Sequence, residues 1–172
     1  LEKHSEGLIA LSGCLAGEIP QALMRGDYDH AKEVALYYLN LFGEDNYFIE
    51  IQNHGLREQM EILPDLIRLS HETGIPLVAT NDAHYLRKED AEMQDVLLCI
   101  QTGKTVDDEN RMRFEQEEFY LKSEEELRQL FPNHDAAFEN TVKIADRCNL
   151  EFTFHEYHLP SFPVPEGYTN EE

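Results

Sequence analysis

Basic residues are scarce in this sequence of 172 residues, which has 14 Lys plus Arg against 35 Asp plus Glu and a formal net charge of −21. A surface of that sign repels the phosphate backbone of nucleic acids at a distance. The shortage therefore excludes a phosphate-backbone clamp as the role of this segment alone. Its acidic runs, at residues 106–110, 115–118 and 123–126, are typical of solvated helix faces and turns, and we assign them no chemistry.

Long hydrophobic runs and cysteine pairs are also missing. No apolar stretch is long enough for a membrane span, so we expect no membrane partner. The start lacks the pattern of a signal peptide and has Leu1 in place of Met, which favours a piece of a longer cytoplasmic chain. The three cysteines lack CxxC spacing, which excludes a disulfide framework and a structural zinc knot and favours a reducing compartment.

Short apolar runs alternate with helical patterns over the first 80 residues. Residues 7–12, 47–52 and 76–80 read as strands, and residues 16–26, 30–42 and 56–72 read as helices. Asp29 is the expected N-cap of the second helix, Pro64 interrupts the third, and Gly74 ends it. The alternation predicts an α/β fold with right-handed crossovers around a parallel sheet, either open or part of a barrel.

Polar side chains follow each predicted strand. In parallel sheets, ligands gather at the carboxyl ends of the strands, so these side chains are candidates for one site. They are Ser12 and Cys14 after the first strand, Glu50, Asn53 and His54 at the second, and Asp82 and His84 after the third.

The stretch "VATNDAHY", residues 78–85, carries the clearest chemistry. Asp82 and His84 offer one oxygen and one nitrogen ligand, a combination that binds Zn, Mn or Fe while leaving positions open for water. Two or more such ions clamp a phosphoryl group and generate hydroxide for phosphoester hydrolysis. In the alternative interpretation, Asp82 caps a helix beginning near Lys88, and His84 packs under Tyr85.

The second half of the sequence reads as mainly helical. Residues 91–105 place Met93, Val96, Leu97 and Ile100 at helical spacing and predict a helix that ends at Gly103. We expect this helix to pack into the core, and the alternative is a partner-binding groove. Residues 119–127 predict a strand that turns into a helix, with Ser123 and Glu126 forming a capping box. A last helix is expected over residues 135–150, and the Pro-rich tail from Leu159 is expected to be irregular.

Several long motifs carry a family resemblance. They are "GLIALSGCLAGEI" (7–19), "YFIEIQNHG" (47–55), "GIPLVATNDAHYLRKEDAEMQDVLLCIQTGKT" (74–105), "NRMRFEQEEFYLKSEEEL" (110–127) and "NTVKIADRCNL" (140–150). In this order they resemble the alpha subunits of bacterial DNA polymerase III, in the later half of their N-terminal polymerase-and-histidinol-phosphatase (PHP) domain. The last residues, 158–172, resemble the connection into the palm of that polymerase.

The resemblance implies a division of the chain and a set of ligands. Residues 1–105 are expected to form the C-terminal part of a distorted parallel β/α barrel of the PHP type, 106–158 a mostly helical connecting segment, and 159–172 a Pro-rich linker. Asp82 and His84 match the last metal-binding motif of the family, and Cys14 is a further expected ligand, as a thiolate. Three further residues are expected either to contact these ligands without binding the metal themselves or to face substrate. They are Glu50, Asn53 and His54.

The same resemblance implies that much of the machinery lies elsewhere. The early His ligands of the PHP site and the palm aspartates that hold Mg are expected outside this chain, so this segment alone should neither complete a metal site nor polymerise DNA. Zn or Mn is the expected metal of the complete PHP site. The expected partners of the parent polymerase are DNA, bound by other domains, and replicase subunits such as the sliding clamp and the proofreading exonuclease.

Three functions remain open from the sequence. The PHP domain is a metal-dependent 3′–5′ exonuclease or pyrophosphate-hydrolysing site within the polymerase, or an inert scaffold that stabilises the polymerase and docks a separate proofreading exonuclease. The third alternative, a stand-alone PHP phosphatase, gives no reason for residues 98–105 and 119–123 to be present.

The charge balance yields a first prediction. Because 35 acidic residues outnumber the basic ones, we expect this chain alone to bind primed DNA no better than an acidic control protein. Fluorescence anisotropy at low salt checks this, since electrostatic binding is strongest there. A sub-micromolar dissociation constant would contradict it.

Overall fold

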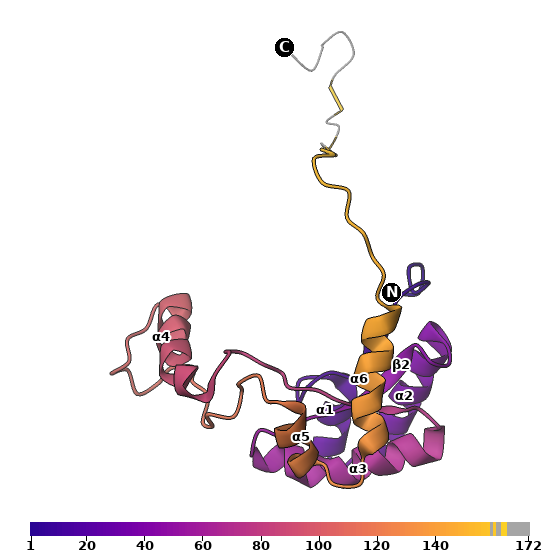
Figure 1. Cartoon of the computed structure of the whole chain (residues 1–172), viewed down its shortest axis with the longest axis horizontal. Coiled ribbons are helices and arrows are strands. Elements are labelled where there is room, and N and C mark those ends of the chain that lie inside the picture. The colour runs from indigo at the N-terminus through magenta and orange to yellow at the C-terminus, as the bar shows by residue number, and fades with distance from the viewer. Residues whose placement is uncertain (159, 161–162, 165–172) are drawn as a thin grey trace.

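The computed structural model describes residues 1–158, 160 and 163–164 (Figure 1). The linker predicted over residues 159–172 therefore lies almost wholly outside the described residues. Within the described part of the chain, no helix is both long enough and apolar enough to cross a bilayer.

A parallel sheet lies at the centre of the described chain, in the strand order β1-β2-β3. The strands are β1 (Ala10–Leu11), β2 (Tyr47–Ile51) and β3 (Leu77–Ala79). They are connected by helices α1 (Glu18–Met24) and α2 (Tyr28–Phe42), and then by α3 (Arg57–Thr73). The predicted α/β alternation is thus confirmed. Each strand is shorter than predicted, because regular pairing covers only part of each apolar run.

Local signals set the helix ends. The Asp27 carboxylate accepts a hydrogen bond from the His30 amide at 3.1 Å, so α2 begins at Tyr28 and the prediction of Asp29 as its cap is wrong. Helix α3 runs through Pro64 without interruption. It ends as predicted at Gly74, whose φ of 74° is a left-handed conformation that glycine adopts without strain.

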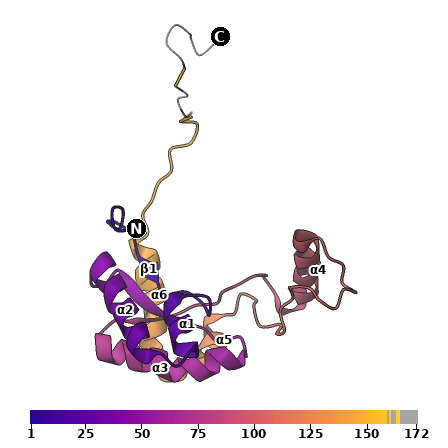
Figure 2. The ribbon, with the colours of Figure 1, turned by 180° about the vertical axis from the view of Figure 1, so that it is seen from behind.

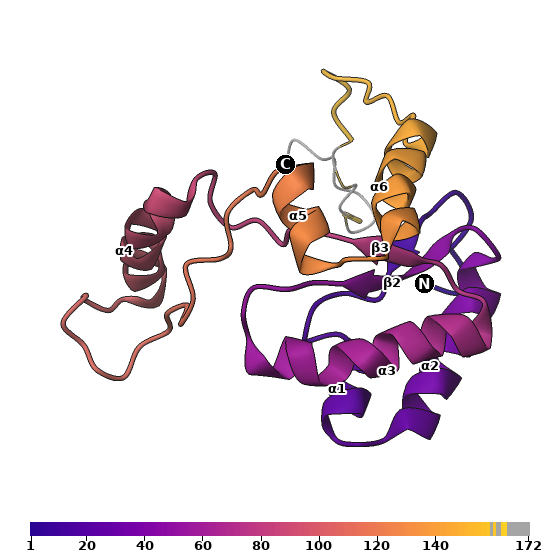
Figure 3. The ribbon, with the colours of Figure 1, turned by 60° about the horizontal axis from the view of Figure 1, so that its bottom comes forward.

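Two helices from the second half of the chain cover the other side of the sheet. These are α5 (Glu124–Leu130) and α6 (Asp135–Arg147). The predicted capping box begins α5: the Ser123 amide donates to Glu126 Oε2 at 2.8 Å, and the Glu126 amide donates to Ser123 Oγ at 3.3 Å. Figure 3 shows α5 and α6 on one side of the sheet and α1, α2 and α3 on the other.

The core is built around β2, whose Ile49 and Ile51 are fully buried. Helix α3 contributes its apolar face, and α1 and α2 contribute small residues that let the helices approach closely. The main contributors are Ile62, Leu66 and Leu69 of α3, Ala22 of α1, and Ala31 and Ala35 of α2.

Helix α6 packs along β3 at the edge of the sheet. The register of the sheet directs the Leu77 carbonyl away from β2, since Pro76 O and the Thr80 amide are the groups that bond to β2. Asn140, a buried residue of α6, donates from Nδ2 to this carbonyl at 2.8 Å. A side-chain amide thus satisfies the edge carbonyl where a further strand would otherwise pair.

Residues 86–117 depart from this compact body. They contain a short 3₁₀ helix (Lys88–Asp90) and α4 (Ala91–Thr102), which stands well away from the sheet (Figure 1, Figure 2). Met93, Leu97 and Ile100 of α4 are exposed. The prediction that α4 packs into the core is therefore wrong, because the helical pattern marks an apolar face without saying what covers it. The end of α4 at Gly103 is as predicted.

The edge contact of Asn140 gives a stability prediction. In Asn140→Leu the partly buried Leu77 carbonyl loses its donor, which costs about 1 kcal/mol of unfolding free energy. Urea denaturation of the 172-residue chain measures this loss. The matched control is Gln129→Leu at an exposed position of α5, where we expect little change. Equal stability of the two variants would contradict the assigned role.

Candidate metal centre at the end of strand β3

Asp82 and His84 lie side by side just beyond the carboxyl end of β3. The distance between Asp82 Oδ1 and His84 Nε2 is 3.4 Å, and about a third of each side chain is exposed, 33% for Asp82 and 38% for His84. Solvent therefore reaches one oxygen and one nitrogen ligand that lie next to each other. The alternative in which Asp82 caps the helix near Lys88 is wrong, because Asp90 accepts the bond from the Arg87 amide at the start of that helix.

The backbone at Asp82 adopts a left-handed conformation, with a φ of 44°. Residues with a Cβ atom are strained there, and such strain persists where neighbouring contacts fix the chain. Fixed contacts lie on both sides. Asn81 Nδ2 donates to the Lys122 carbonyl at 3.2 Å, Asn81 Oδ1 accepts from the Lys122 amide at 3.1 Å, and the His84 amide donates to the Phe119 carbonyl at 2.8 Å.

The segment that provides these contacts, residues 118–122, returns from the α4 region to lie beside residues 81–85. Tyr85 and Tyr120 form a parallel β-bridge, and the Leu121 amide donates to the Tyr85 carbonyl at 3.2 Å. The strand predicted at residues 119–122 is thus reduced to a single bridge. The role of this return segment was missed at the sequence level, because no local pattern reports a pairing between residues 34 to 41 positions apart.

Four rings form a cluster behind the pair. The Phe119 ring stacks on His54 with a centroid distance of 4.3 Å and on Phe114 with 4.5 Å. The His84 ring packs edgewise on Phe119 at 5.6 Å and is tilted against Phe114 at 4.8 Å. The sequence left His84 either as a metal ligand or as a ring packed under Tyr85. In the structure the ring packs on Phe114 and Phe119, and its Nε2 atom stays beside Asp82.

His54 is 1% exposed, and both of its ring nitrogens are occupied. Nε2 lies 2.6 Å from the Asn81 carbonyl, which can only accept, so we assign the proton to Nε2. Nδ1 then accepts from Gln59 Nε2 at 2.9 Å. Burial lowers the pKa of this imidazole below its usual value. Through its bond to the Asn81 carbonyl, the buried His54 ring fixes the chain one residue before Asp82.

Glu50 is engaged in holding the strand ends together. Its Oε2 accepts from the Gly13 amide at 3.1 Å, and its Oε1 accepts from Gln52 Nε2 at 2.9 Å and from the Thr80 hydroxyl. Its own amide donates to Ser12 Oγ at 2.9 Å. Glu50 therefore connects the ends of β1, β2 and β3.

Asn53 lies in the loop after β2, and Cys14 lies in the loop after β1. Asn53 Oδ1 accepts from the Gly55 amide at 3.0 Å and so shapes the turn after β2. Cys14 is exposed after β1. Among the described residues, no three His, Cys, Asp or Glu side chains lie close enough together to hold a metal ion. The described part of the chain thus presents two adjacent candidate ligands, Asp82 and His84, where zinc takes four.

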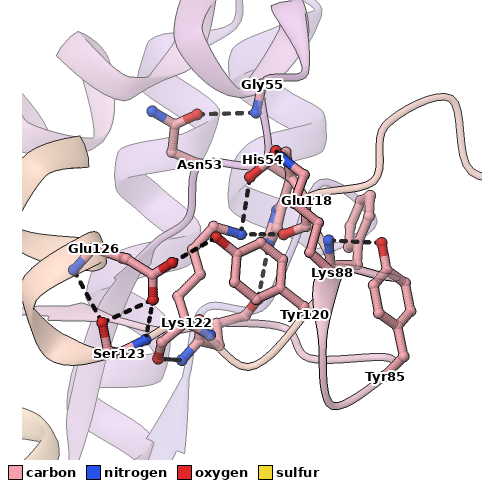
Figure 4. A network of polar contacts seen from close by, with 12 residues as sticks. Asn53, His54, Gly55, Tyr85, Lys88, Glu118, Tyr120, Lys122, Ser123 and Glu126 are labelled. Carbon is pink, nitrogen blue, oxygen red and sulfur yellow. Dashed lines mark hydrogen bonds and ion pairs between the residues drawn. The ribbon is translucent and has the colours of Figure 1, made fainter. Parts of the chain in front are cut away.

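The return segment itself contains a buried lysine, Lys122 (Figure 4). Lys122 Nζ is 3.4 Å from Glu118 Oε2 and 4.1 Å from the centre of the Tyr120 ring. Burial lowers the pKa of this lysine, while Glu118 opposes the shift. Lys88 also donates to Glu118 and holds the pKa of that carboxyl below its usual value. These contacts position the segment that carries Phe119.

Sequence comparisons show which proteins this chain resembles. The PHP domain family matches residues 1–54, which include β1 and β2. The chain is 49% identical over its full 172 residues to DNA polymerase III subunit alpha of Treponema pallidum. Identity is 47% over 97% of the chain for the same subunit of Deinococcus radiodurans, and 46% over 98% for that of Thermus aquaticus.

The resemblance to DNA polymerase III alpha subunits is thus confirmed along the whole chain. The chain spans 15% of the length of the Treponema relative, 13% of the Deinococcus relative and 14% of the Thermus relative. It therefore corresponds to one segment of these long polypeptides.

The buried imidazole gives a pH prediction. The pKa of His54 is lower in the folded chain than in the unfolded chain. Between these two pKa values the unfolded chain binds a proton at His54 and the folded chain does not. Unfolding free energy should therefore fall as the pH drops below about 6.5, with a contribution from His54 of at most about 1.4 kcal/mol per pH unit.

Nuclear magnetic resonance of the labelled histidines measures this directly. We expect His54 to titrate below the ordinary histidine value of about 6.5. His54→Gln assigns the resonance. A His54 pKa at or above the ordinary histidine value of about 6.5 would show that the ring is not held neutral by burial.

Proposed function

We propose that this chain is part of the N-terminal PHP domain of a replicative DNA polymerase III alpha subunit, whose parent protein synthesises DNA on a DNA template. The whole-length identity to these subunits supports this assignment. Location in the bacterial cytoplasm, contacts with replicase subunits such as the sliding clamp and a proofreading exonuclease, and polymerisation with Mg in a palm domain outside this chain follow from the same assignment.

Within that domain, Asp82 and His84 supply two ligands of a metal site completed by residues outside this chain. The observation that carries this proposal is their separation of 3.4 Å at a solvent-accessible strand end. When bound, Zn or Mn would activate water for phosphoester or pyrophosphate hydrolysis. The chain itself orients the ligands: Phe119 and Phe114 fix the His84 ring, and Asn81 fixes the backbone before Asp82.

Barrel geometry belongs to the same proposal. The three parallel strands would be consecutive strands of a distorted β/α barrel, with residues 1–105 as its C-terminal part, 106–158 as the connecting segment and 159–172 as the linker toward the palm. Cys14 would join the site as a thiolate only if its exposed loop closes over the strand ends in the complete domain.

The inert scaffold is the second candidate, and a specific observation favours it. Glu50, in β2, and His54, in the loop after β2, were candidate site residues, yet both are used in structural hydrogen bonds. In this interpretation the PHP segment stabilises the polymerase and docks a separate proofreading exonuclease. A stand-alone phosphatase is disfavoured, because similarity to the polymerase subunits continues through α4, α5 and α6.

Single-ligand variants of the full-length alpha subunit test the site. We expect Asp82→Ala and His84→Ala each to lower bound metal, to abolish any intrinsic 3′–5′ exonuclease activity and to leave primer extension largely intact, because polymerisation uses carboxylates in another domain. Metal content, single-strand digestion and primer extension are measured on one preparation. Asp107→Ala and His71→Ala, both exposed, are the matched controls.

The outcomes separate the candidates. Loss of digestion alone supports the metallohydrolase. Absence of digestion and of bound metal in the unmutated subunit supports the scaffold. Equal loss of digestion and extension would mean that the segment mainly maintains the polymerase fold.

A further inference from the structure

Helix α4 presents a bare apolar face on an arm that extends from the sheet. The arm comprises residues 86–117 (Figure 1, Figure 2). Met93, Leu97 and Ile100 follow one another at helical spacing and are 67%, 56% and 72% exposed. Side chains of this size at positions i, i+4 and i+7 form one continuous stripe.

The opposite face of α4 is covered by the arm itself. Leu98 and Cys99 are buried. Arg111 from the loop after α4 pairs with Asp95, with 2.7 Å between Nη2 and Oδ2, and the Lys104 amide donates to the Cys99 carbonyl at 2.8 Å. The arm is thus an organised unit with one satisfied face, so the exposure of the other face is not the result of a frayed helix.

Charge argues against a second copy of this chain as the occupant of the bare face. Each copy carries a formal net charge of −21, so two copies repel. Acidic residues also flank the stripe, since Glu89 and Glu92 are exposed at the start of the arm. A surface that accepts this face is therefore apolar at its centre and basic at its rim.

The length of the relatives supports a location of this surface on the same polypeptide. The chain spans 15% of the Treponema alpha subunit, and the similarity includes the arm because it extends over all 172 residues. Most of such a polypeptide is therefore available to cover α4. A surface on the same polypeptide also has a far higher effective concentration than a separate protein.

We propose that the exposed face of α4 packs into an apolar groove with a basic rim on another domain of the same alpha-subunit polypeptide. This inference rests on the proposed function only in placing the chain within an alpha subunit. It is independent of whether Asp82 and His84 hold a metal. The arm then acts as the contact that fixes the sheet-bearing body relative to the remainder of the polymerase.

Crosslinking in the full-length subunit tests the occupant. Ile100 is replaced by the photocrosslinker p-benzoylphenylalanine, and crosslinked peptides are identified by mass spectrometry in a mixture of isotopically light and heavy subunits. We expect crosslinks within one polypeptide to residues outside this 172-residue segment. The matched control carries the same crosslinker at Leu36, an exposed residue of α2. Crosslinks between light and heavy copies, or a yield no higher than at Leu36, overturn the proposal.

Charge substitutions give an independent measurement. In the full-length subunit, Leu97→Lys combined with Ile100→Lys should speed proteolytic cleavage within residues 103–117 at least tenfold, because lysines oppose the basic rim and release the arm. The control pair is Leu36→Lys with Met60→Lys, also at exposed apolar positions. In the 172-residue chain, where the face is already bare, the cleavage rate should stay within twofold. Unchanged cleavage in the full-length variant overturns the proposal.

The two proposals fail in different ways. Bound metal and primer extension, measured on the same preparations, report on the proposed function. Crosslinks and cleavage report on the docking of α4. Intact crosslinks with no bound metal would leave the docking in place and reject the metal site.

Discussion

The carboxylate of Glu50 is the interaction on which the arrangement of the strand ends depends. It accepts hydrogen bonds from the amide of Gly13, from Gln52 and from the hydroxyl of Thr80, so one side chain joins residues after β1, β2 and β3. The strands are short, and backbone pairing does not fix the position of the residues that follow them. Glu50 holds Thr80, and the loop that carries Asp82 begins at the next residue. Glu50 therefore fixes the start of that loop.

A second layer of contacts converts that fixed loop into a pair of oriented side chains. The return segment binds Asn81 through the backbone of Lys122 and binds the His84 amide through Phe119. These contacts come from residues far along the chain, and they hold Asp82 in a backbone conformation that a local sequence would rarely adopt. The arm, residues 86–117, lies in the sequence between residues 81–85 and the return segment that pairs with them. Phe114, near the end of the arm, therefore packs against the His84 ring.

The sequence predicted the α/β alternation, the capping box at Ser123 and the adjacency of Asp82 and His84, because each depends on periodicity or on short spacing. It did not predict the contacts of the return segment, since the bonds of Asn81 to Lys122 join positions 41 residues apart. It also placed α4 in the core, because an apolar stripe has the same pattern whether a neighbouring element covers it or not. Metal binding by Asp82, His84 and Cys14 and the predicted domain boundaries stay predictions.

The amide of Asn140 has a consequence for how a larger sheet could assemble. It donates a hydrogen bond to the Leu77 carbonyl, which β3 directs away from β2. Strand β1 forms the other edge of the described sheet, beside a cavity of about 400 Å³ lined in part by Leu11 and Phe42. The unpaired amide and carbonyl groups of an edge strand can pair with any other strand, including one of a neighbouring molecule. With the Leu77 carbonyl bonded to Asn140, the outer edge of β3 offers one acceptor fewer to a further strand, whether of this molecule or of a neighbour.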